Sequence, residues 1–98
     1  MGNVRLSPEA AMLSCTNNGK SVRLAAKEYQ LMELFLRNPH QLLPKENILE
    51  RVWGFDNEAE YNNLPVYLTF LRRKLAFVGA HVEIRASRGL GYMLEETP

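Results

Sequence analysis

The chain contains very little of the residues on which redox and metal chemistry depend. Its 98 residues include one cysteine, Cys15, and two histidines, His40 and His81. One cysteine cannot form an internal disulfide, and these three scattered residues have no recognisable metal-ligand spacing. We therefore expect no disulfide, no zinc site and no cofactor.

Long hydrophobic runs are also missing. Apolar stretches such as Leu34–Leu36 are far shorter than the roughly 20 residues of a bilayer-spanning helix, and Met1-Gly2-Asn3-Val4 begins no apolar signal region. With 46% hydrophobic and 23% charged residues, the composition is typical of one compact globular domain. We expect residues 1–98 to form a single soluble, cytoplasmic domain without a membrane partner.

Motifs for nucleotide binding and catalysis are not found. Neither Gly-x-x-x-x-Gly-Lys-Ser/Thr nor Gly-x-Gly-x-x-Gly occurs in the chain. No carboxylate pair, Ser/His/Asp set or Cys/His set has a spacing that suggests a catalytic centre. The expectation is that the protein is not an enzyme.

Positive charge is scarce overall but unevenly distributed. Residues 1–60 carry seven bases and eight acids, residues 61–94 five bases and one acid, and residues 95–98 two acids. The three segments contribute −1, +4 and −2, which gives the net charge of +1. A short basic run often only solvates a helix face, so the position of these bases in the fold decides what they do.

The apolar periodicity of the first half predicts a small sheet and two helices. Short antiparallel strands are expected at 4–6, 11–15 and 21–24, with Asn18-Gly19 at positive φ in the second turn. A helix is expected over 26–37, where Asn38-Pro39 ends it. A second helix should begin with Pro44 as its first residue and end at Gly54.

A third helix is predicted after an acidic loop at residues 55–61. Apolar residues with offsets of 4, 3, 4 and 3 fall on one face of it, namely Leu64, Leu68, Leu71, Leu75 and Val78. Asn62 or Asn63 can cap its start, Pro65 lies in its first turn, and Gly79 follows its end. The opposite face carries Val66, Thr69 and Arg73, with Phe70, Phe77 and Arg72 on its flanks.

The remainder of the chain predicts a β-hairpin. Val82, Ile84 and Ala86 alternate with Glu83, Arg85 and Ser87, and Arg88 lies at a glycine-containing tip. The fold class is therefore α+β: a winged helix-turn-helix with an N-terminal antiparallel sheet, three helices and a C-terminal hairpin wing. A helix of this kind fits the major groove of DNA, and an arginine on the wing can enter the minor groove.

Four segments resemble the C-terminal effector domain of OmpR/PhoB-type two-component response regulators. They are Leu24-Ala-Ala-Lys-Glu-Tyr29, Leu42-Leu-Pro-Lys-Glu-Asn-Ile-Leu-Glu-Arg-Val-Trp-Gly54, Val66-Tyr-Leu-Thr-Phe-Leu-Arg-Arg-Lys-Leu75 and Arg88-Gly-Leu-Gly-Tyr92. The resemblance implies that the third helix reads the major groove, that Arg88 enters the minor groove and that the loop at 54–62 contacts RNA polymerase. It also implies direct-repeat sites, head-to-tail dimers on DNA and control by a phosphorylatable receiver. Since these 98 residues include no receiver, we expect an excised effector domain or a receiver-less regulator.

Two departures from the family pattern affect the interpretation. Ala25 replaces the usual capping threonine of the first helix, which forgoes about 1 kcal/mol, although Glu28 stays at the third helical position. The segment Leu64–Phe70 lacks the aspartate, the histidine and a base-reading arginine that the family commonly carries there. Fewer charge-assisted contacts with DNA are therefore available.

The candidate DNA-binding residues of the third helix fall into three groups. Val66, Thr69 and Phe70 can touch thymine methyl groups. Arg73 is the best candidate on this helix for a base or phosphate contact. The side chains of Tyr67, Arg72 and Lys74 can reach phosphates, although Arg72 and Lys74 are equally explained as solvated charges.

The other candidates lie outside the third helix. Asn62 and Asn63 are placed where helix amides favour an anion, or they are simple caps. Lys45 can reach a backbone phosphate from the start of the second helix. Arg85 is either a phosphate ligand or a cross-strand ion-pair partner, and Arg88 is the wing arginine.

Two functions remain in view. The first is sequence-specific DNA binding and transcriptional regulation, in which the domain neutralises about four to seven phosphates. The second is a winged-helix module that binds another protein through Val66, Phe70 and Phe77. Because the bases are few, we expect one domain alone to bind DNA weakly and paired domains on repeated half-sites to bind usefully.

Overall fold

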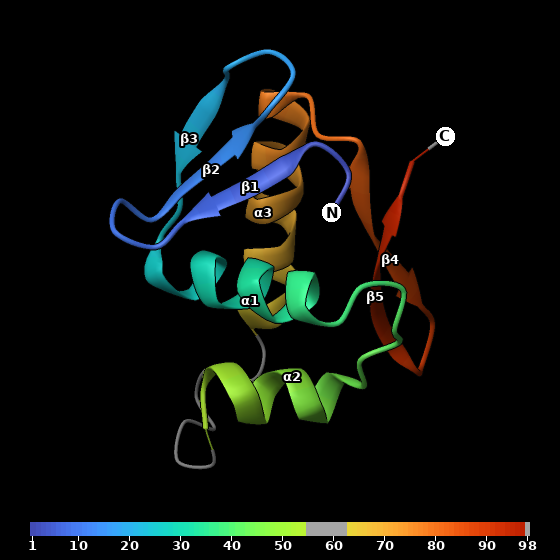
Figure 1. Cartoon of the computed structure of the whole chain (residues 1–98). Helices are drawn as coiled ribbons and strands as arrows, with labels where there is room; N and C mark the ends of the chain where they lie inside the picture. Colours follow the sequence, from blue (N-terminus) through green and yellow to red (C-terminus); the bar gives the residue numbers. More distant parts are fainter. Residues whose placement is uncertain (55–62, 98) are drawn as a thin grey trace.

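The computed structural model describes residues 1–54 and 63–97. The elements of this part are, in chain order, β1 (Val4–Ser7), β2 (Met12–Cys15), β3 (Ser21–Arg23), α1 (Ala26–Arg37), α2 (Lys45–Val52), α3 (Leu64–Val78), β4 (Val82–Ser87) and β5 (Gly91–Glu96). The predicted α+β architecture of sheet, three helices and C-terminal hairpin is confirmed. In Figure 1, α1 crosses α3, the β1–β3 sheet lies beside the C-terminal half of α3, and the β4–β5 hairpin stands to one side.

The N-terminal sheet is antiparallel in the order β1-β2-β3. The turn between β2 and β3 is longer than the predicted tight hairpin. Such a hairpin would need a positive φ at both Asn18 and Gly19, but only Gly19 has one, at +72°. The Asn18 side chain instead donates to the Val78 carbonyl at 2.9 Å and accepts from the Lys20 amide at 2.9 Å. The sheet is thereby attached to the last turn of α3.

Helix α1 has the predicted bounds and an unusual N-terminus. Ala25 occupies the N-cap position and has no side-chain oxygen to offer, so the helix start relies on Glu28. The Oε1 atom of Glu28 accepts from the Ala25 amide at 2.6 Å, which is one half of a capping box. Glu28 is only 3% exposed, so its carboxylate is buried where the helix dipole favours negative charge.

Helix α2 begins one residue later than predicted. Pro44 has φ −60° and ψ 146°, which is extended, and it caps the helix rather than forming its first residue. The reason is the preceding residue: Leu43 pairs with Tyr92 of β5, and this pairing keeps the chain extended up to Pro44. The loop between α1 and α2 thus lies along the hairpin.

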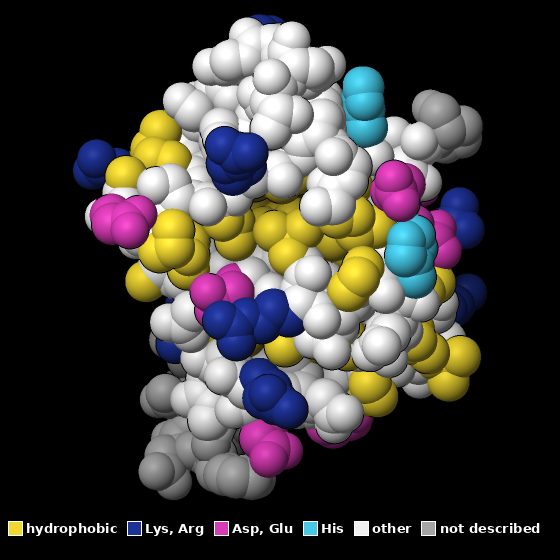
Figure 2. All heavy atoms as spheres, in the orientation of Figure 1, with side chains coloured by type: hydrophobic (Ala, Val, Ile, Leu, Met, Phe, Trp, Pro, Cys, Tyr) yellow, Lys and Arg dark blue, Asp and Glu magenta, His cyan; other side chains and the backbone are white. Residues whose placement is uncertain are grey.

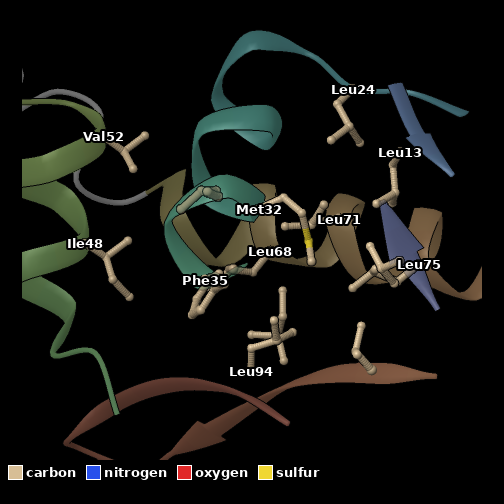
Figure 3. Close-up of a cluster of buried hydrophobic side chains, with 14 of the residues drawn as sticks. Leu13, Leu24, Met32, Phe35, Ile48, Val52, Leu68, Leu71, Leu75 and Leu94 are labelled. Atoms are coloured by element: carbon tan, nitrogen blue, oxygen red, sulfur yellow. The ribbon is translucent and has the colours of Figure 1, made fainter. Parts of the chain in front are cut away.

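The core lies between α1, α3, the sheet and the hairpin (Figure 3). The apolar row of α3 that the sequence predicts is buried in full: Leu64, Leu68, Leu71, Leu75 and Val78. Phe35 and Met32 of α1 and Leu94 of β5 pack against this row. Cys15 is also buried, and desolvation raises the pKa of its thiol. Within the described residues, none of the helices has the length and apolarity to cross a membrane.

The hairpin is the wing that the sequence predicts. Its strands pair in register from Val82 with Glu96 to Ser87 with Gly91. Val82 and Ile84 are buried as expected, whereas Ala86 is exposed because the hairpin extends beyond the core before its tip. The wing is joined to the body by α3 and by the Leu43–Tyr92 pairing.

Candidate nucleic-acid interface

One face of α3 is exposed over its whole length. Val66, Phe70 and Phe77 are 48%, 43% and 61% exposed, and Thr69 and Arg73 are exposed beside them. At about 100° per residue, these five side chains fall within about 100° of the helix circumference, opposite the buried leucines. We call Val66, Thr69, Phe70 and Arg73 the reading face, and Phe77 lies one turn further towards the C-terminus of α3. The predicted exposure of this face is confirmed.

Arg72 lies beside the reading face but is held by the wing. Its Nε and Nη2 atoms donate to the Ile84 carbonyl of β4 at 3.1 and 2.9 Å. The predicted role as a phosphate ligand is untested, and these bonds give the guanidinium a structural task. Arg72 sets the position of the wing relative to α3.

Lys74 is bound within the fold, although its role as a phosphate ligand is untested. Its Nζ atom donates to Oε1 of Glu28 at 2.6 Å and to the Arg23 carbonyl at 2.9 Å. The ammonium is thus paired with a buried carboxylate in the free domain, and the phosphate contact remains a prediction. Glu28 could not be identified as the partner from the sequence, since 46 residues separate the two and no local pattern signals the pairing.

Tyr67 and Thr69 also make contacts within the fold. The Tyr67 ring lies 5.5 Å from the Trp53 ring, centroid to centroid, with the planes at 59°. The Thr69 hydroxyl donates to the Pro65 carbonyl at 2.9 Å, one turn earlier in the helix. The Lys27 ammonium also contacts Trp53: it lies 5.5 Å from the indole ring centroid and donates to the Val52 carbonyl at 3.0 Å.

Arg73 and Arg88 are the arginines best placed to meet a ligand. Both are exposed, and neither has a hydrogen bond or ion pair to another residue in the described ranges 1–54 and 63–97. Arg88 and Lys45 line a common depression of about 210 Å³ between the start of α2 and the wing tip. The sequence suggested each residue separately, but their shared groove depends on the Leu43–Tyr92 pairing and could not be predicted.

The remaining predicted residues have different outcomes. Arg85 lies 3.3 Å from Oε2 of Glu95 and 3.8 Å from Oε1 of Glu83, which favours the ion-pair alternative. Asn63 is exposed at the N-cap position of α3, but its side chain makes no capping hydrogen bond, so the predicted cap is wrong for Asn63. Asn62 and residues 55–62 of the predicted polymerase-binding loop lie outside the described residues.

The charges on the face in Figure 2 have both signs. Lys and Arg side chains lie next to Asp and Glu side chains over α1 and α2, and a band of hydrophobic side chains crosses the middle of the face above them. This face therefore has no patch of one sign that would attract a polyanion. In the described part of the chain, no three His, Cys, Asp or Glu residues are grouped so that they could hold a metal ion.

A three-helix core whose third helix exposes one face, beside a hairpin with an arginine at its tip, defines a winged helix-turn-helix domain. Residues 19–94 match the family model described as "Transcriptional regulatory protein, C terminal", and the chain belongs to this family of OmpR/PhoB-type response-regulator domains.

Relatives and solved structures agree with this assignment. The transcriptional regulatory protein DltR of Streptococcus agalactiae is 44% identical over 96 residues, which cover 98% of this chain and 42% of DltR. The C-terminal domain of the nisin resistance regulator NsrR superposes with a TM-score of 0.81 at 32% identity, covering 100% of this chain and 97% of that one. The DNA-binding domain of response regulator AdeR, solved with an intercistronic region, shares the fold with a TM-score of 0.82 at 20% identity, covering 98% and 97%. The chain thus spans about 42% of the length of DltR.

Proposed function

We propose that the chain is the DNA-binding output domain of a two-component response regulator, with α3 in the major groove and Arg88 in the minor groove. The observation that carries the proposal is that exposed cations lie on two elements: Arg73 on the reading face of α3, and Arg88, together with Lys45, in the groove between the wing tip and the start of α2. A helix such as α3 fits the major groove, and the wing lies next to it. The cations on both elements can therefore pair with the phosphates that border the two grooves of DNA. The domain acts in the cytoplasm and is not an enzyme.

The internal contacts of the bases limit how many phosphates one domain can neutralise. Residues 61–94 carry a charge of +4, but Lys74 is paired with Glu28 and Arg85 with Glu95. About four cationic contacts remain, the lower end of the range expected from the sequence: Arg73, Arg88, Lys45 and Arg72, whose guanidinium also binds the wing. Weak binding by one domain supports direct-repeat half-sites occupied by a head-to-tail pair.

Two further parts of the proposal come from the family. The loop at 54–62 contacts RNA polymerase, and a phosphorylated receiver controls pairing on DNA. The 98 residues would then be the effector domain, either as part of a longer regulator or acting by themselves.

The salt dependence of DNA binding tests this function. With about four phosphates neutralised per domain, the logarithm of the association constant should fall with a slope of about −4 against the logarithm of salt concentration. Arg88→Ala should weaken binding about tenfold, since a groove contact is lost. Fluorescence anisotropy with a selected duplex and a random one measures both effects. If affinity is independent of salt for both duplexes, the proposal is wrong.

The exposed phenylalanines favour one alternative, a protein-interaction module. Phe70 and Phe77 are large apolar side chains in contact with solvent on the same helix face as Val66. In this case Phe70→Asp should abolish regulation, whereas Arg88→Ala should leave it intact. Transcript levels in cells that carry each variant in place of the natural chain distinguish the two functions. DNA binding requires that both variants lose regulation.

A further inference from the structure

We propose that α3 recognises DNA through the C5-methyl groups of thymine, with Arg73 supplying its hydrogen-bonded base contact. The inference rests on the proposed function and adds the class of base sequence that the reading face accepts. It follows from which polar groups of the helix are free and which are used within the fold.

The helix lacks the side chains that read adenine and cytosine by hydrogen bonds. Asn, Gln, Asp and Glu are all missing from Leu64–Val78. Bidentate recognition of adenine requires Asn or Gln, and recognition of cytosine through N4 requires a carboxylate. The polar side chains that the helix does carry are Tyr67, Thr69, Arg72, Arg73 and Lys74.

Four of these five polar side chains have contacts within the fold. The two donors of Arg72 nearest to β4 bind the Ile84 carbonyl, and the Lys74 ammonium is bound to Glu28. Thr69 donates its hydroxyl proton to the Pro65 carbonyl, and the Tyr67 ring is half-buried against Trp53. In the described part of the chain, Arg73 is the one side chain of the five without a contact to another residue, and the Tyr67 hydroxyl makes no hydrogen bond although its ring is packed.

What α3 offers to a base edge is therefore mostly apolar. Val66, Phe70 and the methyl group of Thr69 precede Arg73 along the reading face. Residues 66 to 73 span about 10 Å of helix axis at 1.5 Å per residue, which matches about three base-pair steps of 3.4 Å.

Thymine is the base whose edge complements this surface. Its methyl group is the apolar feature of the major groove, whereas an apolar side chain placed against N7, O6 or N4 desolvates these polar atoms without replacing their hydrogen bonds. The cation at the C-terminal end of the strip distinguishes this surface from a purely apolar protein interface. Arg73 fits a groove bordered by phosphates, and it can bind a guanine next to the thymines.

Replacing thymine with deoxyuridine tests the inference directly, because deoxyuridine pairs identically and lacks only the methyl group. The full chain is titrated with a duplex selected from a random library, with each thymine replaced in turn. We expect Kd to rise about fourfold, equivalent to about 0.8 kcal/mol, at two or three adjacent positions of each half-site. Replacements elsewhere in the duplex should leave Kd unchanged.

A pair of variants assigns the methyl contact to the reading face. With Phe70→Ala, at least one sensitive position should bind thymine and deoxyuridine equally. Phe77→Ala is the matched control: Phe77 lies about 10 Å along the helix from Phe70, so the sensitivity should be retained. Both side chains are exposed, so circular dichroism should show that both variants fold.

The outcomes separate this inference from the proposed function. If the selected duplex is preferred over random DNA but no deoxyuridine position changes Kd, DNA binding stands and methyl recognition is wrong. If the sensitivity remains in Phe70→Ala, the reading face does not make the contact and the inference is likewise wrong. If no duplex is bound in preference to another, both the inference and sequence-specific binding fail.

Discussion

Gly91→Ala is expected to lower the free energy of unfolding by about 3–5 kcal/mol. A Cβ at this position would lie 2.1 Å from the Leu43 carbonyl oxygen and 2.9 Å from the Pro44 Cα. Both atoms belong to the backbone, so no side chain can rotate away to make room. Gly91 also has a φ of +150°, a conformation in which alanine is strained.

The clash acts on the contact that joins the wing to the helices. To admit the methyl group, Leu43 must move away from β5, which breaks the bond from the Leu43 amide to Tyr92 at 2.8 Å and the reverse bond at 3.0 Å. Since Lys45 follows this segment directly, its alignment with Arg88 is lost as well. We therefore expect DNA affinity to fall together with stability.

Gly89→Ala is the matched control for this substitution. Gly89 has a φ of +77° at the same wing tip, but a Cβ there would meet nothing within 4 Å. Only the backbone conformation is then unfavourable, at about 1–2 kcal/mol. Urea unfolding of both variants at 25 °C measures the difference. If Gly91→Ala is no less stable than Gly89→Ala, the backbone of Leu43 and Pro44 does not exclude a side chain at position 91, and the prediction is wrong.

Local periodicity explains why most of the fold could be predicted. The leucine row of α3 repeats at three- and four-residue steps, and only one helix face can bury such a row. The bounds of α1 follow from its apolar stripe and from Asn38-Pro39 in the same way. Alternation in Val82–Ile84 likewise marks a strand with one buried face. These signals act between neighbours along the chain, so the sequence displays them.

The contacts that define the site are between residues far apart in the sequence. The charge of Lys74 can be read from the chain, but its partner, Glu28, lies 46 residues away. Arg72 is bound by a backbone carbonyl, which every residue possesses and no sequence pattern marks. Sequence reasoning therefore located the basic segment correctly but could not say which of its cations are free. The roles in DNA binding came from the family resemblance and remain predictions.

Lys74→Met should destabilise the fold by about 3 kcal/mol without removing a phosphate contact. Glu28 is buried, and without the ammonium its carboxylate keeps, among residues 1–54 and 63–97, only the Ala25 amide as a partner, at 2.6 Å. Removing one partner of a buried ion pair costs about 3–5 kcal/mol, and the Lys74 side chain is 28% exposed, so the lower end applies. The Met side chain keeps the length and apolar contacts of the lysine stem.

The pairing and DNA binding can be separated by two measurements. Glu28→Gln in the Lys74→Met background removes the unpaired charge but keeps an acceptor for Ala25, so the double variant should regain much of the lost stability in urea unfolding. In DNA titrations at several salt concentrations, Lys74→Met should keep the wild-type slope, whereas Arg73→Met should reduce its magnitude by about one. A reduced slope for Lys74→Met would show that Lys74 leaves Glu28 to bind a phosphate. The fixed arrangement of α1 and α3 would then be a property of the free domain alone.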